Sequence, residues 1–258
     1  MLAGSSRLTL VRDAVEGLSR SLAAAGIAGV LVGVPAGLLA RSIMKISAIA
    51  AGPAQSGVHT ENGNVVGALT AEGTIAIVLF AGVGPTVGGA LLYVAVRPWL
   101  LPLERWRGAA LGGYLLAVGG LAGLDPFNFD FQRFGPAALN VAMFCALFLV
   151  VGIALAPVTD AVLARLARGP SGLLVVGFVF SVFGAVALVA VALGSLVSWL
   201  TTGYLPLGDV APMLLAASVG IALAARFGGV SPVSYAAIGI TLAVGIWLTG
   251  NAIVMLLR

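Results

Sequence analysis

The sequence predicts an all-α, polytopic transmembrane helical bundle with a small β-hairpin outside the membrane. Three observations carry this prediction. Of the 258 residues, 60% are hydrophobic and only 9% are charged, whereas soluble domains are about 45–50% apolar and about 25% charged. The mean hydropathy is +1.14. Finally, several uncharged stretches approach or exceed the roughly 20 residues that a membrane-spanning helix needs.

Seven uncharged stretches qualify or nearly qualify as spans. We expect helices over 21–41, 73–97, 108–124, 136–157, 172–200, 209–226 and 233–257. The third and sixth are short between their charged boundaries, so six helices with one half-helix is the alternative. Residues 21–258 then form a single transmembrane domain with two outer loops, 42–72 and 125–135.

Residues 1–20 are predicted to form an amphipathic helix on the cytoplasmic surface of the membrane. Its apolar stripe consists of Leu8, Val11, Val15 and Leu18. Glu16 lies four residues from both Arg12 and Arg20, which places two ion pairs on the opposite, wet face. Two roles stay open: an interfacial anchor or partner contact, and a simple lead-in to the first span.

The distribution of basic residues predicts the orientation, because cytoplasmic loops collect Lys and Arg. An inside N-terminus places nine of the thirteen basic residues in the cytoplasm: Arg7, Arg12, Arg20, Arg97, Arg105, Arg107, Arg165, Arg168 and Arg226. Four fall outside: Arg41, Lys45, Arg133 and Arg258. This bias and the absence of glycosylation sequons indicate a multi-pass protein of a bacterial-type inner (plasma) membrane, with the N-terminus cytoplasmic and the C-terminus outside.

The reactive residues exclude several classes of membrane protein. Cys145 is the single cysteine and His59 the single histidine, so thiolate metal centres and bis-histidine haem ligation are excluded. Lys45 is the only lysine, so the last helix lacks the Schiff-base lysine of a retinal protein. No carboxylate lies in mid-span; Asp160 is near the inner end of the fourth helix. We therefore expect no catalytic residues, no metal, no cofactor and no nucleic-acid partner.

Small residues at four-residue spacing are the main feature of the predicted helices. They are Gly29, Gly33 and Gly37 in the first, Gly84 and Gly88 in the second, and Gly108, Gly112, Gly119 and Gly123 in the third. Such faces let helix backbones approach closely. We expect packing within this bundle, with some faces available to another subunit or to a second copy.

The outer loops are expected to form a docking face. Asn62-Gly63 between β-prone segments indicates a hairpin over 57–66. Acidic residues lie beside turn-forming or aromatic residues in both loops, and the candidate docking residues are Glu61, Asn62, Asp125, Asp130 and Arg133. The hypothesis is that the two loops pack together or on one partner, with Arg41, Lys45 and Arg133 neutralising their carboxylates.

The loop between the second and third helices is basic and aromatic. Arg97, Arg105 and Arg107 accompany Trp99 and Trp106 there, a composition that favours contact with anionic lipid headgroups. Membrane lipids are thus the expected small-molecule partners.

The exclusion of metal, haem, retinal and mid-span carboxylate sites, together with the glycine faces, favours a non-catalytic accessory or scaffold subunit of a larger membrane complex. Such a complex moves lipid or another apolar substrate. The alternative is a stand-alone lipid carrier or flippase, whose apolar interior and basic rim form the route. A distant alternative is an outer-face membrane enzyme using His59, Glu61, Asp125 and Asp130.

Overall fold

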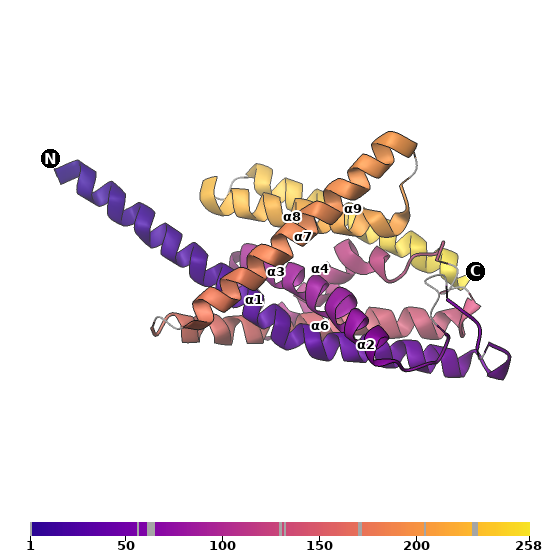
Figure 1. The fold of residues 1–258 in the computed structure, drawn as a ribbon. Helices are drawn as coiled ribbons and strands as arrows, with labels where there is room; N and C mark the ends of the chain where they lie inside the picture. Colours follow the sequence, from indigo (N-terminus) through magenta and orange to yellow (C-terminus); the bar gives the residue numbers. More distant parts are fainter. Residues whose placement is uncertain are drawn as a thin grey trace.

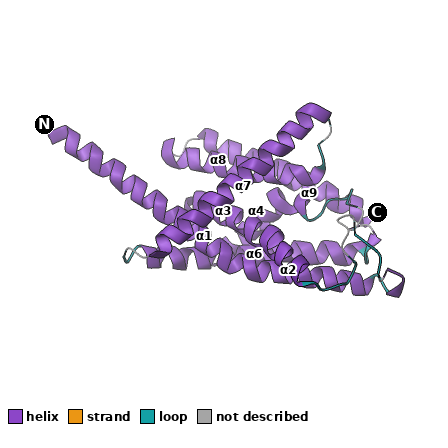
Figure 2. Ribbon diagram, in the orientation of Figure 1, coloured by secondary structure: helices purple, strands orange, loops and turns teal. Residues whose placement is uncertain are grey.

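The computed structural model describes residues 2–55, 57–60, 65–128, 131, 133–169, 172–203, 205–228 and 232–258. Over these residues the regular structure is helical and no strand is present (Figure 2). Six helices of this part of the chain are long and apolar enough to cross a membrane: Val15–Ala50, Ala71–Ala122, Ala137–Leu166, Leu174–Thr202, Gly208–Ala225 and Pro232–Leu257. The predicted class, an all-α protein with multiple apolar helices, is confirmed.

Helix α1 spans Leu2–Ala50, which is 49 residues without a break. It joins the expected surface helix over 1–20 to the expected span over 21–41. The junction is rich in alanine, the residue with the highest helix propensity, so nothing there ends the helix. At about 1.5 Å per residue α1 is about 73 Å long. Figure 1 shows its N-terminal part projecting beyond the other helices.

The far end of α1 also differs from expectation. Residues 42–50, expected to belong to the outer loop 42–72, are helical. The helix ends only where Gly52 adopts a positive φ of 82° and Pro53 follows, a combination that typically terminates helices. Arg41 and Lys45 therefore project from a helix rather than from a loop.

One helical run covers the expected second and third spans. It consists of α2 (Ala71–Ile77), a π-helical segment (Val78–Val83), α3 (Gly84–Leu100), a 3-10 segment (Leu101–Trp106), α4 (Arg107–Gly119) and a last 3-10 turn (Gly120–Ala122). The π-helical segment ends two residues before Pro85, whose missing N–H and ring disturb regular α-helical bonding. Thr70 caps the start, since its side chain accepts a hydrogen bond from the Gly73 amide.

The run reverses direction at Glu104, where φ is 44° and ψ is −113°. Helix α3 is parallel to α6 (Ala137–Leu166), because Gly89 lies near Leu155 and Tyr93 reaches Asp160. Helix α4 is antiparallel to α6, because Gly108 lies against Ile153 and Gly112 against Leu149. Helices α3 and α4 are therefore two antiparallel limbs of one run.

The remaining helices are α7 (Gly172–Thr202), α8 (Leu207–Gly228) and α9 (Pro232–Leu257). Their bounds lie close to the expected ones. Helix α6 differs, because it continues past the expected end at residue 157 to Leu166. Pro157 does not end it; apolar surroundings favour retaining the remaining helical bonds on both sides of a proline. Asp160 consequently lies on a helix, one turn beyond that proline.

The core lies between α1, α3, α4, α6 and α8. Tyr93 and Leu92 of α3 are fully buried there, together with Leu111 of α4 and Leu155 of α6. Helix α7 crosses α1 obliquely (Figure 1), and the crossing is close because Gly177 meets the backbone of Ala23. Most of the large apolar side chains of α7 remain exposed.

The two ends of the bundle differ. The reversal between α3 and α4 and the C-terminal end of α6 lie at one end, which we call the arginine end: Arg97, Arg105, Arg107, Arg165 and Arg168. The described residues of the loops 51–70 and 123–136 lie at the other, the loop end. There His59 and Val65 form one antiparallel bridge. Residues 61–64, the expected turn, lie outside the described residues, so the hairpin stays a prediction.

Candidate functional site

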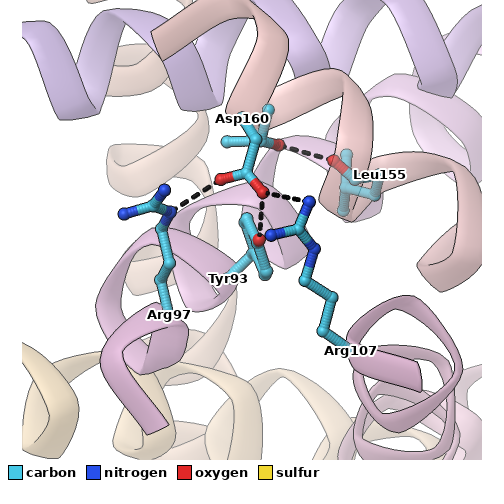
Figure 3. Close-up of polar contacts among 6 residues, drawn as sticks. Tyr93, Arg97, Arg107, Leu155 and Asp160 are labelled. Atoms are coloured by element: carbon cyan, nitrogen blue, oxygen red, sulfur yellow. Dashed lines mark hydrogen bonds and ion pairs between the residues drawn. The ribbon is translucent and has the colours of Figure 1, made fainter. Parts of the chain in front are cut away.

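Asp160 organises the most concentrated group of charges in the described chain. Its Oδ1 lies 2.6 Å from Arg97 Nε, and its Oδ2 lies 2.9 Å from an Nη of Arg107. The Tyr93 hydroxyl donates to the same Oδ2 at 2.9 Å. Figure 3 shows these three side chains converging on the carboxylate from α3 and α4. We call Tyr93, Arg97, Arg107 and Asp160 the Asp160 cluster.

Local sequence explains two of the contacts to Asp160. Tyr93 and Arg97 are four residues apart on α3 and therefore share one face of the helix. The parallel packing of α3 on α6 places this face beside Asp160. A tyrosine hydroxyl and a guanidinium, one turn apart, thus bind the two oxygens of one carboxylate.

Close packing at glycines of α4 and α6 places Arg107, the third residue that contacts Asp160. A Cβ on Gly152 would clash with the backbone nitrogen of Gly112, and one on Gly108 would lie 2.9 Å from the Ile153 Cα. Only glycine allows so close an approach of α4 to α6. Because Arg107 directly precedes Gly108, this contact holds its side chain next to Asp160.

The charges of the cluster do not cancel. Two guanidinium groups face one carboxylate, so a formal charge of +1 remains. The side-chain exposures of Arg97, Arg107 and Asp160 are 36%, 30% and 15%, so the arginines reach the surface while the carboxylate is largely covered. Asp160 accepts hydrogen bonds from three donors, which makes it unsuited to act as a free base or as an ion-binding carboxylate.

Of the three arginines predicted to meet lipid headgroups, Arg97 and Arg107 are bound to Asp160. Arg105 is exposed and its guanidinium lies 5.5 Å from the centre of the Trp106 ring. Sequence reasoning noted Asp160 but did not connect it with the arginines. The available signal was the four-residue spacing of Tyr93 and Arg97 opposite a lone carboxylate at the end of a span.

The glycines selected as packing residues have three kinds of surroundings. Gly29, Gly33 and Gly37 of α1 meet the backbone of Val87, Val83 and Val78, with Cβ to Cα distances of 2.6 Å in each case. Gly88, Gly119 and Gly123 face side chains of Leu215, Phe148 and Phe144. Gly84 meets only the carbonyl of Leu79 in its own run. The α1 glycines therefore form the closest helix contact among these predicted residues.

The outer-face residues are only partly described. Glu61, Asn62 and Asp130 lie outside the described residues. Asp125 accepts a hydrogen bond from the Phe127 amide at 2.9 Å. Arg133 donates to Gln55 at 3.2 Å, which links the two outer loops.

The expected neutralisation of acidic residues by Arg41 and Lys45 is not found among the described residues. Arg41 donates to the carbonyl of Ala68 and Lys45 to that of Gly67, each at 2.6 Å. Because α1 extends to Ala50, both side chains lie beside the returning chain, whose carbonyls near the start of α2 lack helical partners. They hold that segment to α1.

Several polar side chains within the bundle are bonded to the protein itself, although the buried Tyr114 hydroxyl has no hydrogen-bond partner among the described residues. Asn140 accepts from Ser47 at 2.6 Å and donates to the Phe134 carbonyl at 2.7 Å. Thr86, Thr159 and Thr249 donate to the carbonyls of Gly82, Leu155 and Ala117. No group of three or more His, Cys, Asp or Glu side chains suited to a metal ion occurs in the part of the chain that the structure describes.

The architecture is that of a polytopic helical membrane protein with a charged cluster at one end. No family model, no curated protein and no solved structure matches the chain.

Proposed function

We propose that this chain is a non-catalytic accessory or scaffold subunit of a larger membrane complex, one that moves lipid or another apolar substrate. The observation that supports it is a set of glycines inside apolar helices that no other part of the described chain approaches. They are Gly113 in α4, Gly194 in α7, Gly220 in α8, and Gly239 and Gly250 in α9.

Glycine in a helix interior costs about 1 kcal/mol relative to alanine. At Gly33, Gly112 and Gly152 this cost is offset by closer packing, because neighbouring helices come closer than a side chain would allow. The five glycines that nothing approaches, which we call the open glycines, allow no such close helix contact within one chain. A helix of another subunit, or of a second copy, supplies the missing close contact.

The polar groups argue against the carrier and the enzyme alternatives. A solute route needs polar or ionisable lining, whereas the buried hydroxyls of Thr86, Thr159 and Thr249 donate to backbone carbonyls. A cavity of about 270 Å³ lies at the loop end, lined in part by Lys45, Ile49, Pro53 and Val66. It adjoins the loop and α1 rather than a path between the helices.

The proposal includes a topology in a bacterial-type inner membrane. The arginine end faces the cytoplasm, the loop end faces outward, and the chain crosses seven times with α4 as the third crossing. The run Arg107–Ala122 is short, about 24 Å at 1.5 Å per residue against a hydrocarbon core of about 30 Å. Arginines at its start extend it by snorkelling.

The outer loops are proposed as the docking face for a partner outside the membrane. The Arg133 to Gln55 contact brings loop 125–135 to the segment that follows α1. Exposed Phe127 lies in the same loop. The predicted hairpin over 57–66 and the residues Glu61, Asn62, Asp125 and Asp130 belong to this proposal.

The topology predicts which loops a membrane-impermeant thiol reagent reaches. In a Cys145→Ser background, a cysteine at Asn128 should be labelled in intact cells, whereas one at Glu104 should be labelled only after permeabilisation. Reporter fusions should place the two termini on opposite sides. Labelling of both cysteines from the same side would contradict a crossing by α4.

The open glycines give a test of the subunit assignment. Gly239→Leu should leave the thermal stability of the purified chain unchanged, since nothing lies within 4 Å of its Cβ position, and should reduce the partners retained on purification in mild detergent. Ile240→Leu, at an exposed neighbour on α9, is the matched control and should retain them. Undiminished co-purification by the Gly239 and Gly250 leucine variants would contradict the proposal.

A further inference from the structure

We infer that the Asp160 cluster and the adjoining segment Leu101–Trp106 form a binding site for the phosphate of an anionic phospholipid. The inference goes beyond the subunit role and does not depend on whether the chain works alone or within a complex. It begins from the donors that the cluster leaves unused.

Each guanidinium has five N–H donors in a planar fork suited to phosphate. The contacts with Asp160 engage Nε of Arg97 and one Nη of Arg107, so most donors of both groups remain for another acceptor. Figure 3 shows a terminal nitrogen of Arg97 directed away from the carboxylate. Asp160 thus holds two guanidinium groups in place while leaving them able to bind an anion.

The charge of the surroundings favours an anion as well. The chain reversal and its neighbour on α6 carry three arginines and two carboxylates, so their formal charge is +1. These residues are Arg97, Arg105, Arg107, Glu104 and Asp160. Arg165 and Arg168 add exposed positive charge at the same end of α6. The potential therefore attracts a monoanionic phosphodiester from the membrane surface.

Apolar neighbours distinguish a lipid from a free phosphate. Leu101, Leu103 and Trp106 are exposed in the same short segment as Arg105. Leucine and tryptophan beside arginine are suited to a boundary where acyl chains meet headgroups. A soluble phosphate would gain nothing from these side chains, whereas a phospholipid would cover them.

The backbone of this segment is also unusual. Glu104 has a φ of 44°, a conformation that costs free energy for a residue other than glycine and that persists only where its surroundings enforce it. The sharp reversal at Glu104 is what places Arg107 beside Arg97 at Asp160. The strained turn thus brings Arg97 and Arg107 together on Asp160, with Arg105 exposed in the turn itself.

The test uses the purified full chain, delipidated in detergent and supplied with phosphatidylglycerol or phosphatidylcholine. Two readouts are compared: the difference in apparent unfolding temperature between the two lipids, and the ratio of the two lipids retained in native mass spectrometry. Phosphatidylglycerol should raise the unfolding temperature and be retained preferentially. Arg107→Gln and Arg97→Gln should lower this preference about tenfold, as expected for a lost charge-assisted hydrogen bond.

Asp160→Asn separates lipid binding from a purely structural role. It should lower the unfolding temperature in phosphatidylcholine, yet increase the stabilisation by phosphatidylglycerol above that of the wild type, because the phosphate then takes the place of the carboxylate between the two arginines. A lipid preference that is unchanged in Asp160→Asn, Arg97→Gln and Arg107→Gln would show that the cluster is only structural and would overturn the inference.

Arg165→Gln is the matched control, because it removes an exposed positive charge at the same end without touching the cluster. Its loss of preference should be several times smaller than that of Arg107→Gln; an equal loss would mean attraction by the whole surface and would refute a defined site. Inorganic phosphate at millimolar concentration should not reproduce the stabilisation. Full stabilisation by phosphate alone would contradict a lipid site.

Discussion

Asp160→Ala is expected to lower the stability of the purified protein by about 2 kcal/mol, which corresponds to a fall of roughly 4–8 °C in apparent unfolding temperature. The reason is that one substitution removes three contacts, from Arg97, Arg107 and Tyr93, and leaves two guanidinium groups side by side. A fully buried pair would cost about 3–5 kcal/mol, but the arginines here are about one third exposed, which reduces the effect. Thermal unfolding in a neutral detergent measures it.

Glu104→Ala provides the control for the loss of a carboxylate at the same end of the bundle. Glu104 is exposed, so its removal should change the unfolding temperature little. A double-mutant cycle with Arg107→Gln and Asp160→Ala should show coupling between the two positions. Equal stability of Asp160→Ala and Glu104→Ala would contradict a stabilising role for the cluster.

Gly112→Leu is expected to have an equal or larger effect, about 3 kcal/mol or failure to fold. A Cβ at Gly112 lies 2.8 Å from Leu149 Cα and 2.9 Å from the Leu149 carbonyl oxygen. Both are backbone atoms, so the side chain is accommodated only if α4 moves away from α6. Overpacking of this kind costs about 1–3 kcal/mol and sometimes more. Size-exclusion profile and unfolding temperature report the result.

Gly113→Leu tests the same change one residue further along α4. No atom lies within 4 Å of its Cβ position and the residue is exposed. The leucine should be neutral or slightly stabilising, because leucine has the higher helix propensity. If both leucine variants were equally stable, the close contact of α4 with α6 would not exist. Because that contact also positions Arg107, Gly112→Leu should abolish the coupling between Arg107 and Asp160.

The sequence predicted the helices well because their signal is local. Long uncharged stretches between charges are read without knowing the fold, and the starts of α6, α7, α8 and α9 lie close to the expected positions. The ends of α1 and α6 were misplaced for a physical reason. Neither the charge at Arg41 nor Pro157 ends its helix, because helical bonding continues past both residues, to Ala50 in α1 and to Leu166 in α6.

The Asp160 cluster could not be predicted in the same way. Its members come from positions 93, 97, 107 and 160, and their meeting depends on the reversal at Glu104 and on how closely α4 packs on α6. The close approach was indicated by Gly108 and Gly112, yet the sequence does not say which helix a glycine face meets. Gly152, the partner on α6, is followed four residues later by Ala156, but nothing in the sequence pairs this face with Gly108 and Gly112.

Reconstitution of the purified chain alone in liposomes tests the central claim most directly. Protein-containing vesicles and protein-free vesicles are compared for movement of a fluorescent phospholipid between leaflets, with dithionite quenching as the readout. As a subunit that acts only within a larger membrane complex, the chain alone should give the same quenched fraction as protein-free vesicles. Quenching of nearly all the label by the chain alone would show that it is itself the carrier and would contradict the account.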